Sequence, residues 1–163
     1  MRRRCGLKNI KVFVVGRGVA IKQVHKTRTL SMAKALIVKE SKIEERGVFA
    51  GRDFKRGELV VKWDVSHQLT PEEIKKLSEP EKRYVIYFKG KHILMQPPAK
   101  YVNHSCDANT YADNFCDIAK KDIKKGEEIT ANYSETMDIN EFMKCNCGRK
   151  NCRRIIRANS FSN

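Results

Sequence analysis

The chain has 163 residues and a mass of 18.8 kDa, with 40% hydrophobic and 33% charged residues. This length and composition favour one folded domain with its own core over a disordered chain. The longest local apolar run, Val12 to Val15, is far short of the roughly 18 residues that a membrane-spanning helix needs. We therefore expect no membrane span, and we find no segment typical of a secretory signal.

The net charge is +15, and the excess is concentrated at the start of the chain. Residues 1–31 carry nine Lys and Arg and no acidic residue, which leaves residues 32–163 with a net charge of +6. Three interpretations of this basic extension stay open. It is a disordered arm, with Met32 as the alternative start; an Arg-rich transit peptide; or an arm that weakly contacts nucleic acid or another polyanion.

From residue 34 onward the pattern predicts short strands separated by tight turns, the first at 35–38, 47–50 and 59–61. Thr70-Pro71-Glu72-Glu73 predicts the start of a helix, with Thr70 as N-cap and Glu73 as the returning carboxylate of a capping box. We expect a small helical insert around residues 70–88, with a hairpin turn at Lys89-Gly90.

The C-terminal half continues the β pattern. A turn at residues 125–126 leads to a last apolar-rich strand over 129–133. Residues 138–157 are rich in Cys, Arg and Asn and offer little for a hydrophobic core. The fold class that these patterns predict is mainly β.

Cys145, Cys147 and Cys152 place three thiols within eight residues. Two cysteines separated by one residue do not easily form a disulfide with each other, whereas both can ligate one tetrahedral zinc ion. This spacing favours a zinc knuckle over incidental or redox-active thiols, with a fourth ligand from elsewhere in the chain. A thiolate knuckle implies a reducing, intracellular compartment, cytoplasmic or nuclear.

Three segments together resemble the SET-domain protein lysine methyltransferases. They are Arg46 to Ala50 followed by Gly57-Glu58, the Asn-His-Ser-Cys segment within 101–109, and the Gly-Glu-Glu-Ile-Thr-Ala-Asn-Tyr segment at 126–133. The cysteine-rich segment after them resembles the post-SET zinc segment of this family. The resemblance covers about residues 34–157, which is most of the chain.

The resemblance implies a SET-domain β-clip fold, in which the segments 103–106 and 129–133 cross in a pseudoknot-like arrangement. It divides the chain into a basic extension (1–31), a SET domain (32–137), a post-SET zinc segment (138–157) and a tail (158–163). It implies one structural zinc ion, held by Cys106 together with Cys145, Cys147 and Cys152.

The implied methyl donor is S-adenosylmethionine, and the implied partner is a protein substrate that presents a lysine; the oligomeric state stays open. By the same resemblance, Tyr133 is the catalytic residue and Tyr111 a second aromatic residue that lines the lysine site. Residues expected to bind the cofactor are Arg46, Gly47, Val48, Asn103, His104, Tyr133 and Ile155, with Ile156 as the alternative to Ile155.

The chemistry of methyl transfer sets demands on such a site. A lysine attacks only when neutral, yet its ordinary pKa is about 10.4, so only about one molecule in a thousand is neutral near pH 7. A nearby sulfonium and an apolar channel both lower that pKa. The site must therefore be dry, aromatic and narrow, and we expect the Tyr133 phenol to line it.

The chain also departs from the family pattern. Glu45-Arg46-Gly47 stands where the family often has Gly-x-Gly, Lys62-Trp63 replaces the usual Glu-Tyr, and Ala131 lies where Phe or Tyr is frequent. We expect Trp63 to supply the aromatic wall. The rival hypothesis is a non-catalytic SET-like module whose basic arm and zinc knuckle bind protein or nucleic acid.

Overall fold

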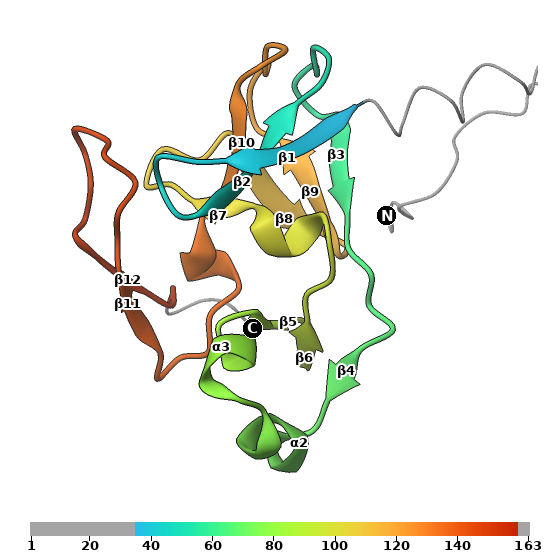
Figure 1. The fold of residues 1–163 in the computed structure, drawn as a ribbon, viewed down its shortest axis with the longest axis vertical. Helices are drawn as coiled ribbons and strands as arrows, with labels where there is room; N and C mark the ends of the chain where they lie inside the picture. The colour runs from blue at the N-terminus through green and yellow to red at the C-terminus, as the bar shows by residue number, and fades with distance from the viewer. Residues whose placement is uncertain (1–34, 160–163) are drawn as a thin grey trace, which may run out of the picture.

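A computed structural model describes residues 35–159 (Figure 1). The basic extension of residues 1–31 and the end of the tail lie outside the described residues, so the predictions about them stay predictions. Within 35–159 the fold is mainly β, as predicted, with only two short α-helices. No helix in this range is long and apolar enough to cross a membrane.

The first sheet combines strands from the beginning of the described chain with strands from residues 103–131. Its order is β1-β2-β10-β7, formed by β1 (Leu36–Glu40), β2 (Arg46–Ala50), β10 (Glu128–Ala131) and β7 (Asn103–His104). β1 and β10 both pair with β2 in the antiparallel sense, and β10 pairs with β7 in parallel. Strands from the two motif segments at 101–109 and 126–133 therefore lie side by side.

A second sheet packs with the first around the core. It has the order β3-β9-β8, formed by β3 (Leu59–Lys62), β9 (Cys116–Ala119) and β8 (Thr110–Asp113). Successive side chains of a strand face opposite sides, so each strand contributes every second residue to the interior. The most deeply buried apolar residues of this core include Val48, Phe54, Val61, Ala119, Ile123 and Ile129.

The insert lies below the sheets in Figure 1 and is only partly helical. It runs through β4 (Gln68–Leu69), α2 (Pro71–Lys76), α3 (Glu79–Lys82), β5 (Val85–Phe88) and β6 (Lys91–Leu94). The capping box is confirmed, since the Thr70 hydroxyl accepts from Glu73 N–H and the Glu73 carboxylate accepts from Thr70 N–H. The β5–β6 hairpin is also confirmed. The helical part of the insert is shorter than predicted and ends at Lys82, because residues 85–88 form a strand in a sheet of order β4-β6-β5.

The predicted strand over 129–133 ends earlier than expected. β10 stops at Ala131, and Tyr133 begins the 3₁₀-helix η2 (Tyr133–Glu135) because the Asn132 side chain accepts a hydrogen bond from Ser134 N–H and turns the chain. A second 3₁₀-helix, η1 (Ala99–Tyr101), precedes β7.

The expectation that residues 138–157 contribute little to a core holds for most of this segment, in which only Cys145, Cys147 and Ile156 are buried. β11 (Phe142–Lys144) and β12 (Ile155–Arg157) form an antiparallel hairpin, seen at the left of Figure 1. Ile156 is almost completely buried there and packs with Met137 and two of the cysteines. A small second core therefore holds this segment against η2.

Two backbone and side-chain contacts fix the crossing of the motif segments. Ser105 N–H donates to Ala131 O at 3.0 Å, and Tyr133 N–H donates to His104 Nδ1 at 3.1 Å. The chain therefore leaves β10 directly over the Asn-His-Ser-Cys segment, as the expected pseudoknot-like arrangement requires.

Candidate active site

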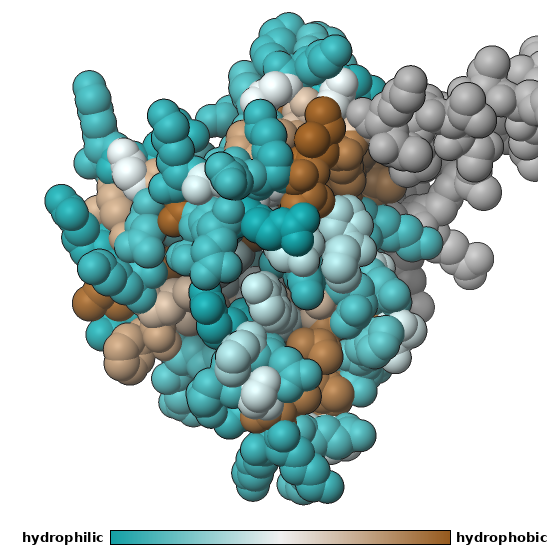
Figure 2. All heavy atoms as spheres, viewed as in Figure 1, coloured by the Kyte–Doolittle hydropathy of each residue, from teal (hydrophilic) through white to brown (hydrophobic). Residues whose placement is uncertain are grey.

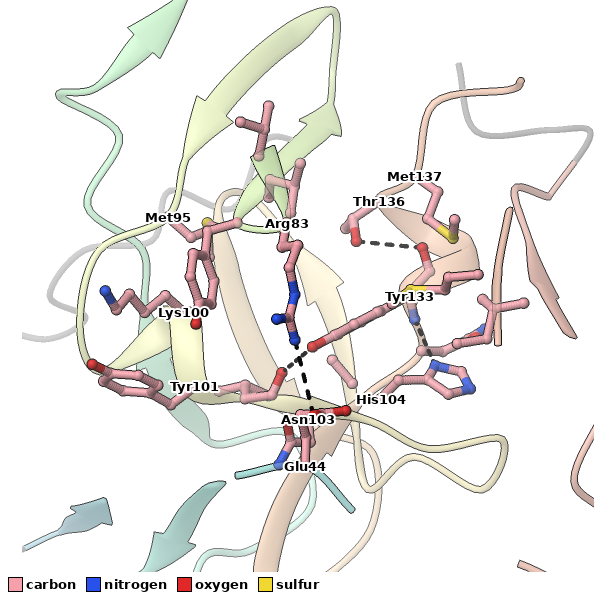
Figure 3. Close-up of a pocket in the computed structure, with 18 of the residues that line it drawn as sticks. Glu44, Arg83, Met95, Lys100, Tyr101, Asn103, His104, Tyr133, Thr136 and Met137 are labelled. Atoms are coloured by element: carbon pink, nitrogen blue, oxygen red, sulfur yellow. Dashed lines mark hydrogen bonds and ion pairs between the residues drawn. The ribbon is translucent and has the colours of Figure 1, made fainter. Parts of the chain in front are cut away.

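A cavity of about 790 Å³ opens between the insert, the β7–β10 crossing and the C-terminal hairpin. Its volume lies in the range of cofactor and substrate sites, about 300–1,000 Å³. Figure 3 shows side chains from all three regions converging on it, with Tyr133 reaching across its centre. The sequence-predicted residues Arg46, Asn103, His104 and Tyr133 all line this cavity.

Tyr133 is held in one orientation at both ends. Its backbone N–H is bonded to His104, and its hydroxyl donates to Val102 O at 2.9 Å (Figure 3). Burial raises the pKa of the phenol well above its ordinary value, with Asp117 and Glu44 adding to the effect. The phenol is therefore neutral at physiological pH and keeps its proton as a hydrogen-bond donor.

His104 is buried and its tautomer follows from its contacts. Because Nδ1 accepts from Tyr133 N–H, the proton lies on Nε2, which is 3.4 Å from Cys106 Sγ. Burial, with a smaller contribution from Arg153, lowers the pKa of His104 to about 4. His104 is thus a neutral ring that links the cavity wall to the cysteine cluster.

Asn103 lies on the cavity wall at the start of the Asn-His-Ser-Cys motif. Its amide nitrogen donates to Arg46 O at 2.8 Å and to Glu128 Oε1 at 2.9 Å. Ser41 Oγ donates to the same Glu128 oxygen at 2.7 Å. A methyl group on Gly47 would overlap that oxygen, so a larger residue at this position requires the hydrogen-bonded Glu128 side chain to shift.

The opposite end of the cavity is formed by the second sheet. Trp63 is 5% exposed and packs edge-on against Phe88, with ring centroids 5.2 Å apart. Its indole nitrogen donates to Asp117 Oδ2 at 2.9 Å. Ala112 and Ala131 complete this end, where Trp63 forms the expected aromatic wall.

Four predicted residues lie outside the cavity lining, and one of them is Gly47, which packs against Glu128 and Ser41. Tyr111 faces away from it, since Ala112 is the neighbour on β8 that lines the cavity and successive side chains alternate. Val48 is completely buried in the core beneath β2, and Ile155 is 47% exposed. Its neighbour Ile156 lines the cavity instead.

Sequence reasoning missed residues that the insert and the loop before β2 bring to the cavity. Arg83, just after α3, lies 3.9 Å from Glu44 across the cavity, in an exposed ion pair visible in Figure 3. Asp117 on β9 and Glu135 on η2 also line it. No local motif marks these residues, because long-range packing brings them together.

The four predicted metal ligands come together beside this cavity. The Sγ atoms of Cys106, Cys145, Cys147 and Cys152 all lie within 4.8 Å of one another. Four thiolates about 2.3 Å from one tetrahedral ion would be about 3.8 Å apart. The measured Cys106–Cys145 separation of 3.7 Å matches that spacing, so the donor set and its geometry suit zinc.

Backbone donors surround the same sulfurs. Arg153 N–H lies 3.3 Å from Cys106 Sγ, and Arg154 N–H lies 3.4 Å from Cys152 Sγ. Such contacts favour the thiolate form that metal binding requires. Gly148, with φ of +64°, takes the left-handed conformation that lets the chain turn back within this short cluster.

Comparison with known proteins agrees with this geometry. The sequence signature of the SET domain matches residues 45–134, which include Arg46, Asn103, His104 and Tyr133. The chain belongs to the SET domain family. The four cysteines extend the site beyond the matched SET domain, because three of them lie after residue 134.

Several curated relatives of this SET domain are named as lysine methyltransferases. Human histone-lysine N-methyltransferase 2D is 28% identical over 131 residues, which cover 70% of the chain. The variant-silencing SET domain-containing protein of Plasmodium falciparum is 31% identical over 145 residues, or 75% of the chain. An H3 lysine-9 specific histone-lysine N-methyltransferase of Fusarium mangiferae is 34% identical over 83 residues, or 38% of the chain.

The relatives are much longer proteins. The matched region spans 2% of the human relative, 6% of the Plasmodium relative and 24% of the Fusarium relative. The similarity therefore concerns the SET domain and leaves out most of each relative.

Proposed function

We propose that this chain is a protein-lysine N-methyltransferase that uses S-adenosylmethionine. The observation that carries the proposal is the position of Tyr133 in the cavity, where its phenol donates to Val102 O and its backbone N–H donates to His104 Nδ1. A neutral, oriented hydroxyl in such a cavity suits a reaction that depends on positioning rather than on a strong acid or base.

S-adenosylmethionine supplies the methyl group as an electrophilic sulfonium. The Tyr133 hydroxyl orients the attacking nitrogen, while Trp63 and the alanines at 112 and 131 exclude water around it. The Val102 carbonyl, already bonded to Tyr133, adds a further acceptor for weak C–H···O contacts at the reacting centre. Exclusion of water keeps more of the lysine neutral, because desolvation disfavours its charged form.

The wall between β2 and β7 suits the methionine end of the cofactor. Asn103 holds the Arg46 carbonyl and Glu128 in place, which leaves its amide oxygen as an acceptor for an amino group. Ile156, Phe142 and Met143 line the cavity next to the C-terminal hairpin and provide an apolar cover for an adenine. Phe142 and Met143 are exposed, and Figure 2 shows apolar residues at the left edge of the surface, over this hairpin.

The proposed substrate is a lysine in a basic, histone-like protein. The curated relatives are named for histone lysines. The cavity does not share the strong positive charge of the chain, because carboxylates balance its cationic residues. These carboxylates belong to Glu44, Glu45, Glu79, Asp117, Glu135 and Glu141. A cavity of this kind accepts a lysine side chain without net repulsion.

We further propose that Cys106, Cys145, Cys147 and Cys152 hold one structural zinc ion in a reducing compartment. All four donors are thiolates, so no coordination position remains for water, as is usual for structural zinc. The ion would fix the C-terminal hairpin against η2 and complete the cavity wall that Ile156 forms.

The experiment is incubation of the full chain with labelled S-adenosylmethionine and a mixture of core histones. The proposal predicts label on histone lysines, located by mass spectrometry, with about one zinc per chain. A host lysate tests other protein substrates in parallel. Cofactor binding without label transfer to any of these proteins would favour the non-catalytic binding module instead.

A further inference from the structure

Asp117 is a buried carboxylate on the wall of the candidate active site. It lies on β9, the central strand of its sheet, and is 2% exposed although it lines the cavity. Its cross-strand partners are Val61 on β3 and Ala112 on β8. A carboxylate buried at such a position costs stability unless a partner compensates for its lost hydration.

The surroundings of Asp117 hold it at one end of the cavity. The Trp63 indole donates to Oδ2 at 2.9 Å, which holds the carboxyl group next to the indole ring. Glu135 approaches from η2 and is itself fixed, since its Oε2 accepts from Ala112 N–H at 3.1 Å. Two carboxyl groups therefore face the same end of the cavity that Trp63 and Ala112 enclose.

The other titratable groups near this end of the cavity do not neutralise the charge of these two carboxyl groups. Tyr133 is neutral, and the cationic Arg83 is paired with Glu44. Burial raises the pKa of Asp117 to about 7, opposed by the Trp63 hydrogen bond and reinforced by Glu135. A positive charge in the cavity next to Asp117 would stabilise its carboxylate form against both the cost of burial and the repulsion from Glu135.

We propose that Asp117 is the residue that receives the target amine: its carboxylate binds the ammonium form on the Trp63 wall and takes up the ammonium proton, which leaves the neutral amine for methyl transfer. The inference rests on the proposed function for the identity of the amine, and adds a specificity residue to it. An alkyl chain capped by an ammonium group fits an aromatic wall with a carboxylate at its end. The site would reject a neutral chain of the same length, because the buried carboxylate would lose its partner.

The first test needs no activity and no variant. The chain has a single tryptophan, so its indole N–H resonance in a proton–nitrogen NMR spectrum reports directly on Asp117. In the full chain this resonance should titrate with an inflection near pH 7. Saturating n-butylammonium should shift the resonance and lower the inflection by about one pH unit or more, while 1-pentanol, of similar length and uncharged, should not.

The second test uses Asp117→Asn, which keeps an oxygen to accept from Trp63. It should weaken n-butylammonium binding about tenfold or more, and should raise KM for a lysine peptide with cofactor affinity unchanged. An indole titration insensitive to the amine, or equal amine binding by Asp117→Asn, would overturn the proposal. Amine binding of the expected kind in a chain that transfers no methyl group would support the role of Asp117 and contradict only the proposed function.

Discussion

At the scale of single residues, the cavity wall next to Asn103 depends on the absence of a side chain at Gly47. Glu128 is held by Ser41 and Asn103, so it cannot swing away freely to admit a methyl group on Gly47. We expect Gly47→Ala to lower the free energy of unfolding by about 1–3 kcal/mol, as overpacking does, and to weaken binding of S-adenosylmethionine. Urea unfolding and calorimetric titration measure the two effects.

A second variant separates the overlap with Glu128 from other effects of an alanine at position 47. In a Glu128→Ala chain the overlapping oxygen is gone, so adding Gly47→Ala should cost clearly less than it does in the wild type. Equal costs in the two backgrounds would show that the Glu128 cluster does not explain the glycine.

A buried acid also sets a pH dependence of stability. The pKa of Asp117 is raised to about 7 from 3.8, so between these values the folded chain keeps a proton that the unfolded chain loses. Stability therefore falls as pH rises through this window. Relative to Asp117→Asn, the wild type should lose up to roughly 4 kcal/mol between about pH 4 and pH 7. Urea unfolding of both chains at several pH values measures this difference, and parallel curves would contradict it.

Motif reasoning predicted the position of a residue where adjacent residues determine it and failed where it depends on long-range packing. Asn103, His104 and Tyr133 sit in contiguous motifs, and all three line the cavity. Tyr111 was expected there as well, but strand alternation turns it away, and alternation depends on a register that a single sequence does not define. Asp117 carries no motif, and only the pairing of β9 with its neighbours shows that it faces the cavity.

At the scale of elements, the C-terminal hairpin links the cysteine cluster to the cavity. Cys145 follows β11, Cys152 precedes β12, and Ile156 on β12 lines the cavity. Cys147→Ser should abolish zinc binding, since three ligands hold the ion far less well than four, and should weaken cofactor binding as the hairpin loosens. Metal analysis and calorimetry on the same preparation measure both.

Cys106→Ser tests the ligand from outside the hairpin, and Cys106 lies 3.4 Å from His104. We expect the same loss of zinc in this variant. Unchanged zinc content would contradict the four-cysteine assignment, whereas loss of zinc with full cofactor affinity would separate the cluster from the cavity.

Element prediction followed the strength of local signals. The capping box at Thr70 and the hairpin at Lys89-Gly90 are encoded by adjacent residues, and both are present. β11 and β12 were missed because each is only three residues long, and because the small core around Ile156 forms only when η2 packs against it. The cysteine spacing predicted that the thiols of this segment lie close together, but it did not predict that β11 and β12 form a hairpin.

At the scale of the whole molecule, the SET domain match and the cysteine cluster both lie after residue 32. We expect a chain that begins at Met32 to fold with the same free energy of unfolding within about 0.5 kcal/mol and to keep zinc and cofactor binding. Chemical unfolding and calorimetry compare the two chains. Unfolding on truncation would show that residues 1–31 belong to the core and that the predicted domain boundary is wrong.

The claim that the cavity transfers methyl groups is tested most directly by Tyr133→Phe. This change removes one oxygen, with its bond to Val102, and hardly alters the packed volume. Loss of one oriented group at a preorganised site costs about 2–4 kcal/mol in the transition state, or roughly 30- to 1000-fold in rate. Tyr87→Phe, on β5 and outside the cavity lining, is the matched control.

The measurement is the initial rate of label transfer from S-adenosylmethionine to core histones by wild type, Tyr133→Phe and Tyr87→Phe, with calorimetric titration of the cofactor on each. We predict a rate lowered by roughly 30-fold or more for Tyr133→Phe alone, with cofactor affinity retained, because the lost interaction acts mainly in the transition state. A Tyr133→Phe rate within about twofold of wild type would contradict the account, since it would make Tyr133 structural and leave the cavity without its central catalytic residue.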